Sequence, residues 1–226
     1  MSGMIGSVEG NSGVIGAMTG PGFKSMQVFT SDGTWTKPKG INTVKVIVTG
    51  AGGGGGSTND DDMANGGGAG ATAIKVLDVT DIDTCTVTVG AGGAGAPSNT
   101  LSHAYGGTSS FAKASGSGSF TTISCTGGSR YGGTWAIGGN GGTASGGDIN
   151  VSGSAGLGGL IDNTGNHQAA GSGGASFWGQ GGRGATRNLD QSQDGTAFGS
   201  GGGGRANSSG GERQGAPGIV VVEEYT

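Results

Sequence analysis

The sequence predicts an all-β protein in which a small sheet, formed by N- and C-terminal strands, carries a region of packed glycine rods. Three observations lead to this prediction. Glycine supplies 59 of the 226 residues, the β-branched runs fall mostly near the two ends of residues 26–226, and no three-turn window has the apolar spacing of a helix. Almost no α-helix is therefore expected.

The clearest strand is expected over residues 43–49, where Val44, Val46 and Val48 share one face. Residues 26–36, with a turn at Ser31 to Gly33, are typical of a hairpin that leads into a sheet. Further strands are expected over 72–79, 84–89, 109–112, 121–125 and 218–225. Because the strongest runs lie near both ends, we expect the first and last strands to pair and to close a sheet from which the glycine-rich middle projects.

The middle, residues 126–216, alternates short glycine runs with polar or aromatic inserts. Glycine disfavours a helix by about 1 kcal/mol per residue, and four prolines without a three-residue glycine repeat exclude collagen. Extended polyglycine-II rods, with about three residues per turn, can instead bond amide to carbonyl between neighbours. Only Gly and Ala fit that spacing, so the bulky inserts are expected at the ends of the bundle.

The charge balance argues against two classes of partner. A net charge of -4 and a pI near 5.0 make nucleic acid and anionic membranes poor candidates. Residues 1–25 are small, polar and punctuated by glycine, with neither a signal peptide nor a membrane span. They are expected to form an attachment segment, and residues 26–226 the binding domain.

Cys85 and Cys125 each fall on the apolar face of an expected strand, Cys85 with Val87 and Cys125 with Ile123. Two small buried thiols are the favoured interpretation. A disulfide between them is the alternative, because sequence alone does not fix their geometry.

Several long motifs resemble the glycine-rich C-terminal domain of bacteriophage and prophage tail fibre proteins. The first runs from Val28 to Pro38 and is followed by residues 44–50 and a polyglycine run; the last runs from Gly215 to Tyr225. Between them, residues 86–93, 107–111, 147–153 and 174–179 also match that family's internal pattern. More loosely, the chain is similar to the tip adhesins of T-even-like phages, in which packed polyglycine-II rods present receptor-binding loops.

This resemblance implies a tail fibre tip protein in the virion, assembled in the host cytoplasm and released by lysis. It implies recognition of a surface polysaccharide or an outer-membrane protein on the bacterial host. The family's shaft is missing, since only some 25 residues precede the domain. The expected assembly is therefore a homotrimer, or a monomer that caps a trimeric fibre, attached to another tail fibre or tail tip protein through residues 1–25.

Candidate contact residues are large side chains that stand among glycines. Exposed aromatic rings stack on sugars, and guanidinium groups bridge acidic sugars or phosphates. The candidates are His103, Tyr105, Arg130, Tyr131, Trp135, Asn166, His167, Trp178, Arg187 and Arg205. The competing interpretation is that aromatic residues such as Trp35 and Phe111 plug the strand and rod junctions, and that the arginines only keep the bundle soluble.

The sequence indicates no enzyme and no cofactor. Asp60, Asp61 and Asp62 form a weak cation site without EF-hand spacing, and a plain acidic loop is favoured. No phosphate-binding glycine motif, catalytic triad or carboxylate pair can be nominated. The alternatives to an adhesin are a self-assembling filament or ice-binding polyglycine-II protein and, last, a polysaccharide depolymerase.

Overall fold

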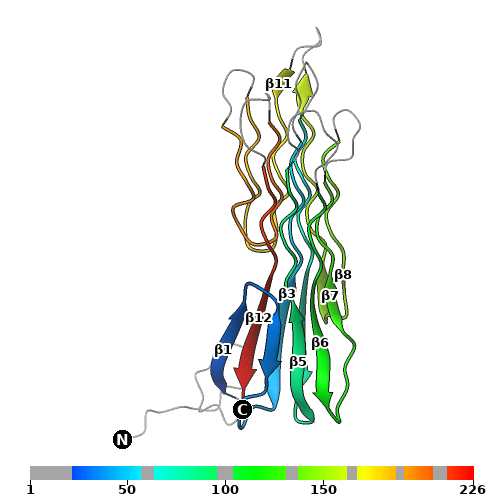
Figure 1. Cartoon of the computed structure of the whole chain (residues 1–226), viewed down its shortest axis with the longest axis vertical. Coiled ribbons are helices and arrows are strands. Elements are labelled where there is room, and N and C mark those ends of the chain that lie inside the picture. Colours follow the sequence, from blue (N-terminus) through cyan, green and yellow to red (C-terminus); the bar gives the residue numbers. More distant parts are fainter. Residues whose placement is uncertain are drawn as a thin grey trace, which may run out of the picture.

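The computed structural model describes residues 22–56, 64–95, 104–130, 137–161, 167–186, 191–205 and 213–226. Within these ranges the chain is built of antiparallel strands and extended segments without a helix, which confirms the all-β prediction. The same ranges accordingly hold no helix with the length and hydropathy of a membrane span. Figure 1 shows strands at one end of an elongated molecule and extended segments running from them to the other end.

The strands form two five-stranded sheets and a two-stranded one. The first sheet has the order β1 (Phe23–Phe29), β12 (Ile219–Tyr225), β3 (Thr43–Thr49), β4 (Thr72–Asp78) and β9 (Ile149–Val151). The second has the order β2 (Gly33–Thr36), β5 (Ile82–Thr88), β6 (Ser109–Gly116), β7 (Ile123–Cys125) and β8 (Ala144–Ser145). The two-stranded sheet pairs β10 (Leu160–Ile161) with β11 (His167–Ala169).

The first and last strands pair, as predicted. β1 lies antiparallel to β12, with Val28 opposite Val221. The Thr226 amide also donates to the Gly22 carbonyl at 3.2 Å. Both ends of the described chain therefore meet at the sheet end of the molecule, and the sheet already begins at Phe23.

The hairpin predicted over residues 26–36 is wrong. β1 pairs with β12 in the first sheet, whereas β2 pairs with β5 in the second, where Trp35 lies opposite Cys85. The short link between β1 and β2 carries the chain from one layer to the other. This crossing buries Trp35 between the sheets, which a hairpin within one layer would not do.

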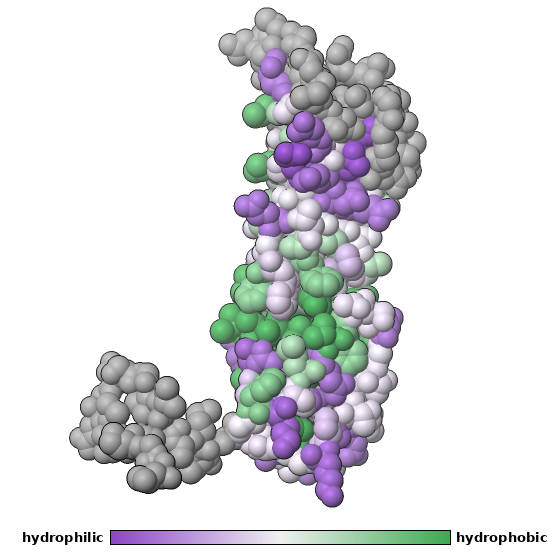
Figure 2. All heavy atoms as spheres, turned by 90° about the vertical axis from the view of Figure 1, so that its left-hand side faces the viewer, coloured by the Kyte–Doolittle hydropathy of each residue, from purple (hydrophilic) through white to green (hydrophobic). Residues whose placement is uncertain are grey.

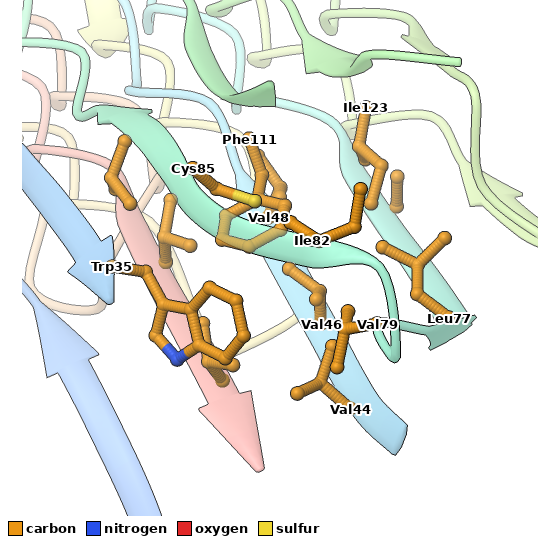
Figure 3. Packing of buried hydrophobic residues seen from close by; sticks show 14 of the residues in the cluster. Trp35, Val44, Val46, Val48, Leu77, Val79, Ile82, Cys85, Phe111 and Ile123 are labelled. Atoms are coloured by element: carbon orange, nitrogen blue, oxygen red, sulfur yellow. The ribbon is translucent and has the colours of Figure 1, made fainter. Parts of the chain in front are cut away.

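The core lies between the two five-stranded sheets (Figure 3). Val44, Val46 and Val48 face it from β3, and Trp35 and Phe111 fill it from the second sheet, with ring centroids 6.0 Å apart. Both rings are fully buried, which confirms the interpretation of these two aromatics as plugs. Successive side chains of a strand point to opposite faces of the sheet, so every second residue faces this core.

Cys85 and Cys125 are buried in the same core as free thiols, as the favoured interpretation predicted. Burial raises the pKa of each thiol to about 12. The Cys125 thiol donates to the Val48 carbonyl at 3.2 Å, across the two sheets.

The glycine rods are the continuations of the strands. Twelve extended segments can be followed in the described ranges: 50–56, 64–71, 90–95, 104–108, 126–130, 138–142, 152–158, 170–175, 181–185, 192–195, 200–205 and 213–218. In residues 50–56 the amides of Gly50 and Gly53 donate to rod 64–71, those of Ala51 and Gly54 to rod 104–108, and those of Gly52 and Gly55 to rod 213–218. Partners that repeat every third residue are the signature of a three-residue turn.

Rods 50–56, 64–71 and 200–205 form the centre of the bundle. Each of them bonds to the other two, as in the bonds from Gly53 to Gly68, Gly67 to Gly202 and Gly202 to Gly53. Each central rod also bonds to four of the other nine rods, and these nine form a ring around the three central ones. Two of the central rods precede residue 126, so the prediction that confined the rods to residues 126–216 is wrong. The glycine run after β3 forms one of these three central rods.

Backbone contact leaves no room for side chains at the centre. A Cβ atom added to Gly52 would lie 1.9 Å from the Ser200 carbonyl oxygen. Ala51 and Ala69 are accommodated in the same rods and are fully buried. Where rods touch through their backbones, the bundle thus accepts only glycine and alanine, whereas Asn65, Ser200 and Arg205 are larger residues that are nevertheless buried in the central rods.

Candidate functional site

One end of the bundle lies opposite the sheets, where Gly22 and Thr226 meet. At five of the six gaps in the described ranges, the segments on either side of the gap meet at this end of the bundle. Gly56 donates to Asn65, Ala104 to Ala94, and Ser129 to Asn140, at 2.8–2.9 Å. Leu160 pairs with Ala169, and Gln193 donates to Arg183. Arg213, which follows the sixth gap, accepts a bond from Gly55 of a third rod. We call this end the distal end (Figure 1).

Several predicted contact residues lie outside the described ranges, so the structure does not place them. These are His103, Tyr131, Trp135, Asn166 and Arg187, together with Asp60, Asp61 and Asp62 of the weak cation site. The backbone of His167 is placed in β11, opposite Ile161.

The structure brings two of the predicted residues together at the distal end. The Cζ atom of Arg130 lies 5.7 Å from the centroid of the Tyr105 ring, which is the geometry of a cation–π contact. The two side chains come from neighbouring rods, since the Gly106 amide donates to the Gly128 carbonyl at 2.9 Å. Tyr105 keeps 62% of its surface exposed, so the pair is available to a partner.

Three exposed aliphatic residues, Ile137, Leu157 and Leu160, continue this surface over the next two rods. Rod 126–130 bonds to rod 138–142, which in turn accepts a bond from Gly156. Arg130 and Leu157 also lie at a similar height along the bundle. In rod 64–71, the Gly68 amide donates to the Ser129 carbonyl and the Gly66 amide donates to the Leu157 carbonyl. We define the distal belt as Tyr105, Arg130, Ile137, Leu157 and Leu160.

The sequence reasoning missed the aliphatic part of the belt because it considered only aromatic and charged inserts. A signal was present, since Leu157 stands between Gly156 and Gly158 and Ile137 directly precedes Gly138. On an outer rod, a large residue has no room on the side where the backbones touch. Such a residue therefore points outward, and several on neighbouring outer rods form a surface.

Trp178 does not belong to the belt. It lies in the turn between Ser176 and Gly179, close to the sheets, where its indole Nε1 donates to Thr49 Oγ1 at 2.9 Å. Phe177 packs against it edge-on, with ring centroids 5.3 Å apart. Trp178 is 37% exposed and so presents part of its ring, but on the side of the molecule.

Arg205 differs from the expectation that its guanidinium group faces a partner. Only 1% of its surface is exposed, and its amide donates to the Gly56 carbonyl at 3.0 Å as a member of a central rod. Its place in the centre of the bundle explains the burial.

The geometry agrees with a comparison of the sequence with known families. A family model described as a glycine-rich domain matches residues 28–225, from β1 to β12. The chain belongs to this glycine-rich domain family. Comparison with curated proteins finds no match. The family match covers both sheets and the whole bundle, so the two parts of this glycine-rich domain form one unit.

At the sheet end, the pKa departs from its ordinary value in Cys85, Cys125, Asp78, Asp148, Glu223 and Tyr225. The described part of the chain holds no cluster of three or more His, Cys, Asp or Glu side chains that fits a metal ion. The distal belt offers an aromatic ring, a guanidinium group and aliphatic surface, which suit binding by shape and stacking.

Proposed function

We propose that this glycine-rich domain is the receptor-binding tip of a bacteriophage tail fibre, an adhesin that binds the surface of a bacterial host. The observation that carries the proposal is the position of Tyr105 and Arg130. They form an exposed pair at the distal end, while Gly22 and Thr226 meet at the sheet end. A molecule that is attached at one end and binds at the other needs this separation.

The rigidity of the bundle supports a binding role. Each central rod is bonded to six neighbours, so the belt is held on a scaffold whose backbone is already ordered. Binding then costs little additional conformational entropy, which favours affinity. The bundle also tolerates changes in outward residues, because its packing depends on glycine backbone.

The chemistry of the belt favours a carbohydrate or the exposed part of an outer-membrane protein. The Tyr105 ring offers a stacking face, and Arg130 beside it offers planar donors to an acidic sugar or a phosphate. Leu157 and Leu160 add exposed apolar area at the distal end.

The rest of the assembly is part of the same proposal. Residues 1–25 attach the domain to another tail fibre or tail tip protein, with the domain as a homotrimer or as a monomer cap. The protein belongs to the virion and reaches the outside by lysis. It binds no nucleic acid and does not insert into a membrane.

The experiment measures binding of the fluorescently labelled full chain to a panel of bacterial strains. Tyr105→Ala with Arg130→Gln should lower binding to a recognised strain at least about tenfold, the loss of roughly 1.4 kcal/mol. The matched control is Phe23→Ala, which removes an exposed aromatic ring at the sheet end and should leave binding unchanged.

Two outcomes would contradict the proposal. Binding by the double variant at the level of the control would exclude the belt, and no binding to any strain of a broad panel would exclude an adhesin. Exchange of residues 131–135 or 163–168 with another fibre's insert should shift the range of strains bound, with thermal unfolding unchanged.

The alternative functions have less support. An ice-binding face is flat and regularly spaced, whereas Tyr105 and Leu157 project at the distal end from rods that two other rods separate. Thermal hysteresis measurements and electron microscopy of the purified chain test the ice-binding and filament versions. Release of oligosaccharide from capsule or lipopolysaccharide tests a depolymerase.

A further inference from the structure

The first strand enters the domain at the sheet end and runs towards the distal belt. Rod 213–218 leads from the bundle directly into β12, so β12 runs away from the bundle. β1 is antiparallel to β12 and therefore begins at the far end of the sheet (Figure 1). A pull applied through the residues before Gly22, against a hold at the distal belt, accordingly acts along the length of β1.

Such a pull loads the pair of β1 and β12 in shear. The hydrogen bonds of an antiparallel pair are perpendicular to its strands. A force along the strand therefore strains all of these bonds at once, and the six residue pairs from Phe23 with Tyr225 to Phe29 with Val220 share the load. A force that separates the two strands from one end would instead break the pairs one after another.

β12 is fixed to the rest of the domain and does not follow β1. Its other edge pairs with β3 over seven residues, from Ile219 with Thr49 to Tyr225 with Thr43. β3 continues into rod 50–56, which is one of the three central rods. The load therefore passes from β1 through β12 into the bundle that carries the distal belt.

Side chains add cross-links that must break before β1 can slide. Ser25 Oγ and Gln27 Nε2 both donate to the buried carboxylate of Glu224, the second at 2.7 Å. Hydrogen bonds to a carboxylate are stronger than those between neutral groups. The rings of Phe23 and Tyr225 also meet edge-on, with their centroids 5.9 Å apart.

β1 has a neighbouring strand on one side only. It lies at the edge of the first sheet, and the described residues place no strand on its outer side. Met26 and Val28 are about half exposed there. Figure 2 views the side of the molecule that bears β1 in Figure 1 and shows apolar surface gathered near mid-height between polar regions. The contacts of β1 with β12 therefore decide whether this strand withstands a pull.

We propose that the pair of β1 and β12 is a mechanical clamp, which keeps the domain folded under tension between its sheet end and its distal end. The clamp is directional. Gly22 and Thr226 lie side by side at the same end of the two strands, so a pull through both chain ends unzips the same pair. The use of the clamp rests on the proposed function, because a fibre tip anchored at one end and bound at the other is pulled along β1. The mechanical property itself does not depend on that function.

Single-molecule force spectroscopy of the full chain tests the clamp. One handle is fixed to the N-terminus, and the other to the C-terminus or to a Leu157→Cys variant in the distal belt. The introduced thiol can be labelled selectively because Cys85 and Cys125 are buried. Unfolding through the distal handle should need at least about twice the force of unfolding through the two chain ends, because the bonds between β1 and β12 then share the load.

A variant of β1 tests whether the cross-links to Glu224 take part. Gln27→Ala should raise the rate of unfolding under a constant pull towards the distal handle about fivefold, the loss of one hydrogen bond of about 1 kcal/mol. The matched control is Gln214→Ala, which removes the same side chain from an exposed position of rod 213–218 and should leave this rate unchanged. If Gln27→Ala does not fold, Ser25→Ala replaces it, since the Ser25 hydroxyl donates to the same carboxylate.

Equal forces in the two pulling directions would overturn the proposal. So would a folded Gln27→Ala variant that resists the pull towards the distal handle as well as the wild type does. Failure of the domain to bind any bacterial strain would contradict the proposed function but leave these forces unchanged, so the two failures can be told apart.

Discussion

Trp35 Nε1 donates a hydrogen bond to Glu224 Oε1 at 2.8 Å, in the buried space between the two sheets. Glu224 also accepts bonds from Gln27 Nε2, at 2.7 Å, and from Ser25 Oγ. One carboxylate thus joins β1, β2 and β12. A buried carboxylate is tolerated here because its oxygens are supplied with donors.

The first prediction concerns this carboxylate. Glu224→Ala leaves the buried Trp35 donor without its acceptor, which costs about 1–3 kcal/mol, and also removes the acceptor of the half-buried Ser25 and Gln27. The free energy of unfolding, measured in denaturant, should therefore fall by more than about 1 kcal/mol. Glu223→Ala, the next residue on the opposite face of β12, loses an ion pair that is partly exposed and should change stability by less than about 1 kcal/mol. Similar losses for the two variants would contradict a structural role for Glu224.

The second prediction concerns the centre of the bundle. Gly52→Ala places a methyl group 1.9 Å from the backbone carbonyl of Ser200, which cannot move aside as a side chain could. The cost should exceed about 3 kcal/mol, the upper range for overpacking. Gly22→Ala is the control, because a Cβ atom there meets nothing within 4 Å. A stable Gly52→Ala variant with unchanged thermal unfolding would show that rod 50–56 is not closely packed.

The third prediction concerns the thiols. With the pKa of Cys85 and Cys125 raised to about 12, only about one thiol in ten thousand is ionised at pH 8. An alkylating reagent should therefore modify neither residue in the native protein and both in denaturant, as read by mass spectrometry. Reductant should leave thermal unfolding unchanged, since the two thiols are free. Rapid alkylation of the native protein would contradict their burial.

The fourth prediction concerns acid stability. The backbone amide of Val76 donates to Asp148 Oδ2 at 2.9 Å and, with Lys75, holds the pKa of this carboxyl below its ordinary value of 3.8. A carboxyl whose pKa is lower in the folded state stabilises the fold above the unfolded pKa, and the contribution is lost as pH falls towards the folded one. Asp148→Asn should accordingly unfold at a lower temperature than the wild type at pH 7, and the two should converge below about pH 3.

The control for this measurement is Asp83→Asn, which removes a carboxyl at an exposed position of β5. It makes the same chemical change at a carboxyl that takes no part in the hydrogen bonds from Val76 and Lys75. A constant difference between Asp148→Asn and the wild type from pH 7 to pH 2 would show that the charge of Asp148 is not involved.

The strands that the sequence predicted well are those with local, regular patterns. Val44, Val46 and Val48 alternate with polar or outward residues, and β3 covers the expected residues 43–49. β8 and β9 were missed because they are only two and three residues long, too short for a reliable pattern. Of the distal belt, Tyr105 and Arg130 were predicted as single residues, but their contact was not, because it joins two rods separated by the whole of β6 and β7.

By itself the sequence determined that the chain is all-β, that its two ends meet, and that bare backbone replaces an ordinary core in much of the molecule. These properties follow from composition and from patterns within a few residues, above all the clustered glycines that admit no side chain between rods. Only the tertiary structure decided which strands share a sheet, which three rods lie at the centre, and which outward side chains become neighbours. Those outcomes depend on hydrogen bonds between segments far apart in the chain, such as the bond from Gly53 to Gly68 and the bond from Gly202 to Gly53. One glycine run resembles another in sequence, so the sequence does not show which runs lie at the centre of the bundle. The hydrogen-bond partners of each run decide its place.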